Sequence, residues 1–413
     1  MHHPLSDIER CPPEILAGAL FSPGRNMGKS AVVYSSLRDA AAGREMGDQI
    51  RRALGNESPD AVILFSAPDN RLQTLVDALN AACDPAEMVG CSSAGGFAAG
   101  IAGPGLSCAI AFRSPEMRFS SAVGMGVGDD PVHAAAEFLS AFKGEDLPEF
   151  RYRNALVLTD ALAGFADRLI DELTVQTGGT YQFFGGGAGD NARFLRTEVF
   201  ARNEVLNNAA VGLEILSHKP LGLGVEHGWL PATLPMRVTE AAGMRVTSLD
   251  GAPAIEAYES HAAASGQTFN RADPLPFFLH NVLGIQTSQG FKLRVPLSVG
   301  EDGSLLFAAE VPEGLTASIM RATVASAVEA AGTATKSALA QLGEHKPQVA
   351  LFFDCVATRL RMGDDFNLEL GALQTELGGA GYAGCNTHGQ IARSDDQFSG
   401  FHNCTAVVCV FPE

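Results

Sequence analysis

Gly90-Cys91-Ser92-Ser93-Ala94-Gly95 is a glycine-rich phrase that returns near the C-terminus as Gly384-Cys385-Asn386-Thr387-His388-Gly389. Each copy follows one apolar run and precedes another. A looser third copy runs from Phe183 to Asp190 and contains Gly185-Gly186-Gly187. A repeated order of strand, helix, strand, glycine turn and strand predicts an α/β fold built from related units.

The segments between these phrases alternate between apolar runs and amphipathic stretches. The pattern predicts strands at 61–66, 155–158 and 349–355, and helices at 35–53, 70–82, 131–142, 164–176, 252–261 and 369–377. Residues 291–299 and 304–311 flank Glu301-Asp302-Gly303 and predict a hairpin. The alanine-rich, proline-free stretch 316–342 predicts one long helix or two short ones.

The length of 413 residues predicts more than one domain. The signal changes between residues 240 and 253, so we expect an N-terminal leader at 1–28, a first α/β domain at 29–243 and a second at 244–413. Each domain is expected to hold mixed β-sheets flanked by helices, because strands with helical crossovers alternate with hairpins.

Composition argues against several classes of partner. The net charge of −18 disfavours nucleic acid and anionic membranes, which are both polyanions. The N-terminus carries no signal-peptide pattern, and no apolar stretch is long enough to span a bilayer. The eight cysteines contain no CxxC pair, so the chain is expected in the reducing cytoplasm with free thiols.

Several motifs of the chain resemble those of a known protein family. Val89–Gly95, Phe184–Asp190 and His227-Gly228-Trp229 resemble the FIST N domain. The FIST C domain is similar to four further segments: Phe291–Leu297, Phe352–Cys355, Gly384–Ile391 and His402–Thr405. The resemblance implies a sensory, ligand-binding protein, with small ligands such as amino acids. Some members of that family are described as haem-binding nitric oxide sensors that act on a partner kinase.

The strand exits are the expected binding region. Backbone amides in glycine turns bind carboxylates well, and the three turns are expected to meet around one cavity. The alternative is that these glycines only permit tight turns. The candidate ligand-binding residues are Cys91, Ser92, Ser93, Gly186, Gly187, Asp190, Asn191, His227, Trp229, Arg294, Cys355, Arg359, Thr387, His388, Gln390 and Asn403.

Several of these candidates have a structural interpretation as well. Arg294 lies among apolar residues, so it is either paired, exposed on an edge strand, or clamps an acidic ligand. Cys355, with Arg359 nearby, is either a core thiol or a sensor with a lowered pKa. Asp190 either accepts from a ligand amine or caps a turn.

The expected function is a cytoplasmic small-molecule sensor that relays ligand occupancy to a separate signalling partner, such as a kinase. The first alternative is a haem-based gas sensor, with His227, His388 and His402 as candidate haem ligands. The second is a thiol or serine hydrolase, although Cys91–Gly95 lacks the first glycine of G-x-S-x-G. No enzyme activity is expected. No metal site is expected either, since neither CxxC nor HxxxH spacing occurs.

Overall fold

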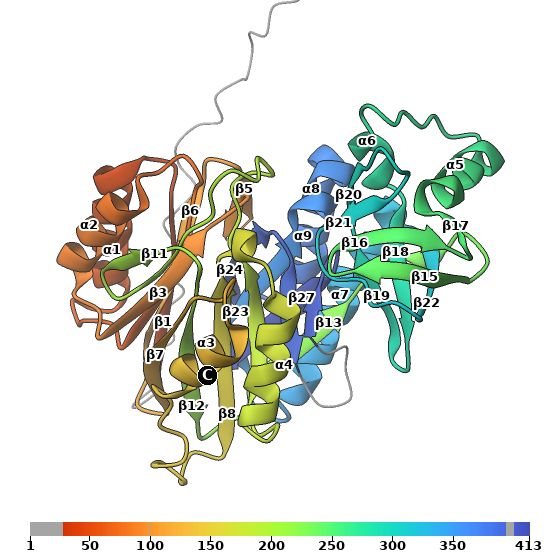
Figure 1. Cartoon of the computed structure of the whole chain (residues 1–413). Helices are drawn as coiled ribbons and strands as arrows, with labels where there is room; N and C mark the ends of the chain where they lie inside the picture. The colour runs from red at the N-terminus through yellow and green to blue at the C-terminus, as the bar shows by residue number, and fades with distance from the viewer. Residues whose placement is uncertain (1–27, 99, 394–399) are drawn as a thin grey trace, which may run out of the picture.

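The computed structural model describes residues 28–98, 100–393 and 400–413. These residues form three similar α/β units that surround a common core, and a β-rich domain inserted into the third unit (Figure 1). Within the described residues, none of the helices is both long and apolar enough to cross a bilayer.

The first unit contains β1 (Lys29–Ser35), α1 (Asp39–Ala53), β2 (Ala61–Ser66), α2 (Leu72–Cys83), β3 (Glu87–Ser92), β4 (Gly96–Ala98), β5 (Ile101–Gly103) and β6 (Ser107–Arg113). The second unit contains β7 (Met117–Met125), α3 (Pro131–Leu139), β8 (Tyr152–Thr159), α4 (Ala166–Gln176), β9 (Gln182–Gly187), β10 (Val199–Ala201), β11 (Glu204–Leu206) and β12 (Ala209–Ser217).

The third unit begins with β13 (Gly222–Glu226) and resumes after the inserted domain with α7 (Val324–Gln341), β23 (Pro347–Cys355), α8 (Val356–Met362), α9 (Phe366–Leu377), β24 (Gly381–Thr387), β25 (Gln390–Arg393), β26 (Gly400–His402) and β27 (Ala406–Pro412). The inserted domain contains β14 (Leu230–Pro231), β15 (Met236–Ala242), β16 (Arg245–Leu249), β17 (Ala252–Pro253), α5 (Ala254–Ser265), α6 (Leu275–Phe278), β18 (Val282–Thr287), β19 (Gly290–Arg294), β20 (Pro296–Val299), β21 (Leu305–Phe307) and β22 (Thr316–Arg321).

The three units exchange hairpins in a closed ring. In each unit the two inner strands are parallel: β2 with β3, β8 with β9, and β23 with β24. A hairpin then leaves each unit and extends the sheet of another, with β4 on β24, β10 on β3, and β25 on β9. Separating any two units would therefore break backbone hydrogen bonds as well as packing.

The core lies where the inner faces of the three sheets meet, and the helices cover the outside (Figure 1). Phe112 and Phe411, from the first and third sheets, have ring centroids 4.7 Å apart. Phe65 packs edge-on against Phe353 at 5.5 Å. β2 is buried along its whole length, because this core covers one face and the helices α1 and α2 cover the other. The expected α/β fold with mixed sheets built from repeated units is thus confirmed.

The structure groups the chain differently from the expected division at residue 243. That position lies in the turn between β15 and β16, which pair antiparallel within the inserted domain. β13 pairs with β27, so residues 222–226 belong with the C-terminal unit. The expected leader, 1–28, lies outside the described residues except for Gly28.

The prediction of helix throughout 316–342 is wrong in its first part. Thr316–Arg321 is β22, which pairs with β18 on one side and with β14 and β15 on the other. The helix begins only after Thr323, whose side chain accepts from the Ser326 backbone while Ser326 accepts from the Thr323 backbone. Alanine content favoured helix, but burial of Ala317 and Ile319 in a central strand outweighs that weak local preference.

Candidate functional site

The three glycine phrases meet at one point. The phrases are joined by backbone hydrogen bonds, and three of these bonds, at equivalent positions, close a ring: Ala94 N–H to the Asn386 carbonyl oxygen at 2.8 Å, Gly189 N–H to that of Ser92 at 2.9 Å, and His388 N–H to that of Gly187 at 3.1 Å. The ring relates equivalent positions of the three units, so the repeat seen in the sequence is a repeat in space.

The centre of this ring is packed. A Cβ on Gly189 would lie 2.5 Å from the Ala94 nitrogen, and one on Gly186 would lie 2.8 Å from the Gly389 carbonyl oxygen. These glycines are therefore needed for the close approach of the backbones. The cavity that we expected between the three phrases is not at the centre of the ring. It lies beside the ring.

A cavity of about 230 Å³ opens beside the ring, between the first and second units. It is lined by Ser66, Ala67, Pro68, Asn70, Leu72, Ser92, Asp190, Arg193, Leu195, Arg196 and Glu198. We call it the strand-exit cavity, because Ser66 and Ser92 end the parallel strands β2 and β3. Ligands of α/β proteins commonly bind outside the carboxyl ends of parallel strands.

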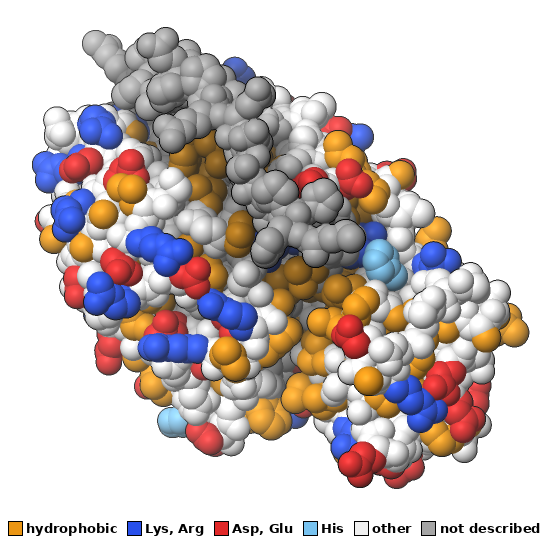
Figure 2. Space-filling view, turned by 90° about the horizontal axis from the view of Figure 1, so that it is seen from above, with side chains coloured by type: hydrophobic (Ala, Val, Ile, Leu, Met, Phe, Trp, Pro, Cys, Tyr) orange, Lys and Arg blue, Asp and Glu red, His pale blue; other side chains and the backbone are white. Residues whose placement is uncertain are grey.

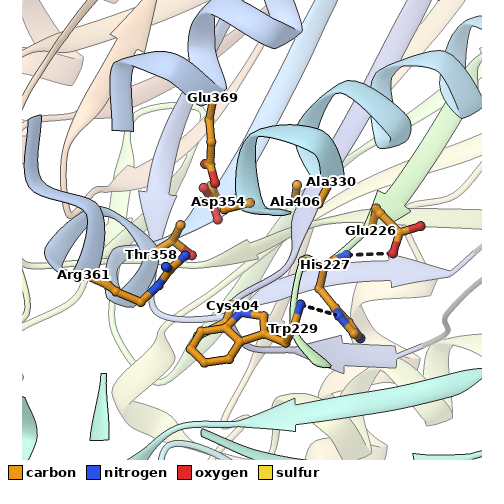
Figure 3. Close-up of a pocket in the computed structure, with 12 residues that line it drawn as sticks. Glu226, His227, Trp229, Ala330, Asp354, Thr358, Arg361, Glu369, Cys404 and Ala406 are labelled. Atoms are coloured by element: carbon orange, nitrogen blue, oxygen red, sulfur yellow. Dashed lines mark hydrogen bonds between the residues drawn. The ribbon is translucent and has the colours of Figure 1, made fainter. Parts of the chain in front are cut away.

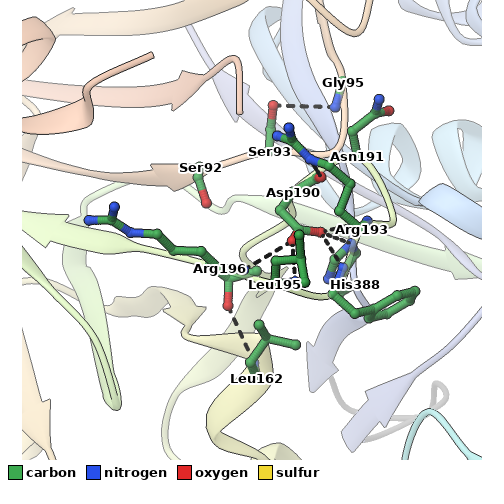
Figure 4. Close-up of polar contacts among 12 residues, drawn as sticks. Ser92, Ser93, Gly95, Leu162, Asp190, Asn191, Arg193, Leu195, Arg196 and His388 are labelled. Atoms are coloured by element: carbon green, nitrogen blue, oxygen red, sulfur yellow. Dashed lines mark hydrogen bonds and ion pairs between the residues drawn. The ribbon is translucent and has the colours of Figure 1, made fainter. Parts of the chain in front are cut away.

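Asp190 builds one wall of the strand-exit cavity (Figure 4). Its carboxylate accepts the backbone N–H groups of four consecutive residues, 193–196, at 2.7–3.1 Å. Burial by itself would raise the pKa of Asp190, but the loop amides outweigh it and the pKa lies below the usual value. Asp190 therefore caps a turn, as one of the two interpretations expected. The loop that it holds includes Arg193 and Arg196, which line the cavity.

His388 lies behind this loop. Its ring stacks on Phe194 with centroids 4.7 Å apart, and its Nε2 is 3.5 Å from the Asp190 Oδ1. Burial lowers the pKa of His388 to about 4, against the opposing effect of Asp190. The imidazole is therefore neutral at neutral pH, and its contact with Asp190 is not an ion pair.

A second, smaller pocket lies in the third unit, beside residues 227–229, which lead into the inserted domain (Figure 3). It has room for about 10 Å³, the size of one water molecule, and contains the predicted pair His227 and Trp229. His227 Nε2 is 2.9 Å from the Phe291 carbonyl oxygen, and its Nδ1 accepts the Trp229 backbone N–H at 3.3 Å. Burial lowers the pKa of His227. We call this space the hinge pocket.

Arg294 is held by an ion pair. Its Nη2 donates to the Asp167 carboxylate at 2.6 Å, and Lys292 reaches the same carboxylate at 2.5 Å. The Arg294 side chain is 2% exposed and also donates to the carbonyl oxygens of Glu310, Leu293 and Phe401. Of the three alternatives for Arg294, the buried ion pair is therefore the one observed. Arg294 lines neither pocket.

Most of the other candidates are buried between units. Cys91 is in the central core, and Ser93 accepts from the Gly95 backbone. Gln390 donates to the Thr387 hydroxyl and accepts from Thr405, while Asn403 accepts from Val295. Arg359 donates to Asn191. The pKa of Cys355 is lowered, but the first cause is a hydrogen bond from Cys404 and not a neighbouring arginine.

Several residues that line the pockets had no motif to mark them. Ser66 and Asn70 follow β2, and Glu369 is in the first turn of α9. The repeat itself was the available signal, because Ser66, Thr159 and Asp354 lie at the C-terminal ends of the equivalent strands β2, β8 and β23, opposite Ser92, Gly187 and Asn386.

The three histidines do not form a haem site in this conformation. His227 faces a space of about 10 Å³, and the strand-exit cavity is lined by no histidine. His402 is buried, and its pKa is lowered to about 3 by that burial and by Lys292 and Arg294. Haem is larger than either space, so the residues present do not fit it. Within the described residues, no cluster of three or more His, Cys, Asp or Glu could hold a metal ion.

Two family models match the chain. The FIST N domain model matches residues 60–252 and the FIST C domain model matches residues 254–393. Together they cover most of the chain, which therefore belongs to the FIST family. FIST domains are associated with sensory and signalling roles. The boundary between the two family models, at 252–254, lies inside the inserted domain. Each family model therefore covers part of the inserted domain as well as parts of the α/β units.

Individual relatives are distant. An uncharacterized protein of Methanocaldococcus jannaschii, MJ1623, is 23% identical over 310 residues, which cover 70% of this chain and 58% of that protein. The chain thus spans less than two thirds of that relative's length. Cyanuric acid hydrolase from A. caulinodans is 9% identical with a TM-score of 0.37, covering 93% of this chain and 99% of that one. PurLQS from Thermotoga maritima is 10% identical with a TM-score of 0.22, covering 94% and 73%. Both TM-scores are too low to indicate a shared fold.

Proposed function

We propose that this FIST protein is a sensor that binds a small molecule in the strand-exit cavity and relays its occupancy to a separate signalling protein in the cytoplasm. The observation that carries the proposal is the cavity of about 230 Å³ where the ends of β2 and β3 meet the loop 190–198. Its volume is below the range of about 300–1,000 Å³ typical of drug-sized ligands, so the ligand is small.

The lining indicates a polar ligand with an anionic group. Ser66 and Ser92 offer hydroxyl groups. Arg193 offers a guanidinium group, whereas that of Arg196 is ion-paired with Glu198 in the same lining. Arg193 pairs with Asp69 at 3.1 Å, but both side chains are about half exposed, so this pair is weak and a ligand carboxylate can replace it. An amino acid or another small acid fits these partners.

The position of the cavity supports the proposed relay. Residues 66–92 belong to the first unit and residues 190–198 to the second, so a ligand would contact both. A ligand that binds one arrangement of the two units more tightly shifts the population toward it. The partner, a kinase or another signalling protein, would bind that arrangement preferentially.

Thermal-shift screening tests the proposal. A ligand specific for the folded protein must raise the melting temperature, so amino acids and other small acids are screened at millimolar concentrations with haemin included. The response is then compared in Arg193→Gln and in Arg245→Gln. Arg245 is a matched control, since it forms an exposed ion pair with Asp302 in the inserted domain, outside the cavity lining.

We expect at least one small acid to stabilise the wild type and Arg245→Gln, and to stabilise Arg193→Gln less. An absence of any hit would contradict ligand binding. A hit that both variants retain in full would move the site away from the strand-exit cavity.

The proposal includes no catalytic step. Ser92 Oγ accepts the backbone N–H of Glu198, and no histidine or lysine lines the cavity beside it. We therefore expect Ser92, Ser93 and Cys355 to remain unlabelled by activity-based serine and thiol probes. Labelling of any one of them that is lost on its substitution by alanine would favour the hydrolase alternative.

A further inference from the structure

The hinge pocket lies where the chain passes into and out of the inserted domain. The chain enters through 228–230 and leaves through 321–323. Arg361 on α8 contacts both crossings: its guanidinium lies 5.1 Å from the Trp229 ring centroid, and its Nη1 donates to the Ala322 carbonyl oxygen at 3.4 Å. This one side chain therefore fastens both crossings to the third unit.

Two carboxyl groups face one another in the same pocket (Figure 3). Asp354 is the last residue but one of β23, Glu369 lies in the first turn of α9, and each residue is 2% exposed. Asp354 Oδ2 and Glu369 Oε2 accept from no donor among the described residues. Buried carboxylates in contact cannot both be ionised without a large cost, so such a pair holds a proton between them.

Titration of this pair is displaced toward higher pH. Burial raises the pKa of Glu369 well above its usual value, and the negative charge of Asp354 raises it further. Burial likewise raises the pKa of Asp354, in spite of its hydrogen bonds and of Arg361. The proton is therefore retained well above the pH at which an exposed carboxyl group loses it.

We propose that Asp354 and Glu369 form a proton-binding site that controls how firmly the inserted domain is seated on the third unit. With the proton bound, the pair carries one negative charge and Arg361 stays against Trp229. Loss of the proton adds a second buried negative charge. The Nε and Nη2 groups of Arg361 have no acceptor among the described residues, so the guanidinium is drawn toward the carboxylates and away from both crossings.

The direction of the pH effect follows from the raised pKa values. A folded protein that binds this proton more tightly than the unfolded chain loses stability as pH rises through the folded-state pKa. The contact between the inserted domain and the third unit is therefore more stable below that pH and less stable above it.

The other groups around the pair are few. Glu226 and His227 approach from the end of β13, Cys355 and Cys404 lie beside the pair, and α7 presents only alanine side chains. The pKa of His227 is lowered by burial, so its own titration falls on the acid side of its usual range. His227 is thus the group whose titration must be distinguished from that of the carboxyl pair.

Trp229 makes the test direct, because it is the single tryptophan of the chain and is 3% exposed. We would record the emission maximum of the full chain from about pH 5 to about pH 9, a range that spans ordinary carboxyl and histidine titration. We expect a shift to longer wavelength as pH rises in the wild type. Glu369→Gln, a neutral isostere, should keep the low-pH emission throughout, and the control His227→Gln should keep the wild-type transition.

Backbone exchange provides a second measurement. Hydrogen exchange of residues 228–230 and 321–323 should accelerate with pH beyond its chemical pH dependence in the wild type, and not in Glu369→Gln. The proposal is overturned by a wild type whose emission does not change, by a transition that survives in Glu369→Gln, or by one lost only in His227→Gln. If circular dichroism shows that Glu369→Gln is unfolded, the wild-type titration and Asp354→Asn decide.

Discussion

Asp190 organises the wall of the strand-exit cavity, and replacing it with alanine removes the acceptor of four backbone N–H groups. A hydrogen bond to a charged group contributes about 1.5–3 kcal/mol. The four bonds do not add, because the loop rearranges as one segment and its exposed amides reach water. We expect Asp190→Ala to lower the free energy of unfolding by about 3 kcal/mol, with the loop loosening before the rest of the fold.

Asp130→Ala is the matched control. Asp130 is exposed and caps α3 through one bond to the His133 backbone N–H at 3.0 Å, so its loss should lower the free energy of unfolding by about 1 kcal/mol. Urea denaturation measures both variants, and hydrogen exchange of residues 193–196 measures the loop. Because the pKa of Asp190 is lowered, the loop should hold through neutral and mildly acidic pH and loosen only as pH falls below about 3.8.

Two outcomes would refute this reasoning. One is an Asp190→Ala variant whose loop amides exchange at the wild-type rate. The other is a loss of stability no larger than that of Asp130→Ala. Either would mean that packing of the loop, and not the carboxylate, holds the cavity wall.

Three further predictions follow from buried contacts. Asp167→Asn removes the countercharge of buried Arg294 and should lower the free energy of unfolding by about 3–5 kcal/mol in urea denaturation, and Lys292→Gln by clearly less. Gly384→Ala should abolish soluble expression, because its Cβ would lie 1.8 Å from a carbonyl oxygen, whereas Gly332→Ala, with open space around it, should be stable by thermal denaturation. The seven described cysteines are buried and free, so Ellman's reagent should label them rapidly only in denaturant, and fast labelling of the native protein would contradict the described packing.

The alternation of buried strands and amphipathic helices was readable from the chain, since it depends on which residues are apolar along a short segment. β2 was predicted with its bounds, and the helices α1, α2 and α4 to within a few residues. The strand β22 was missed because the alanine content of the stretch 316–342 favours helix, and only the pairing of β22 with β18 and β15 outweighs that local preference.

The repeated glycine phrase determined, from sequence alone, that the fold is built of related units and that its strand exits are the place to look for a site. Only the tertiary structure decided that the hairpins cross between units and that the ring centre is filled. It also decided that Arg294 meets Asp167, 127 residues away, and that Asp354 meets Glu369. The physical reason is range: periodicity encodes which face of a segment is buried, but which distant side chain it meets depends on how the whole chain closes.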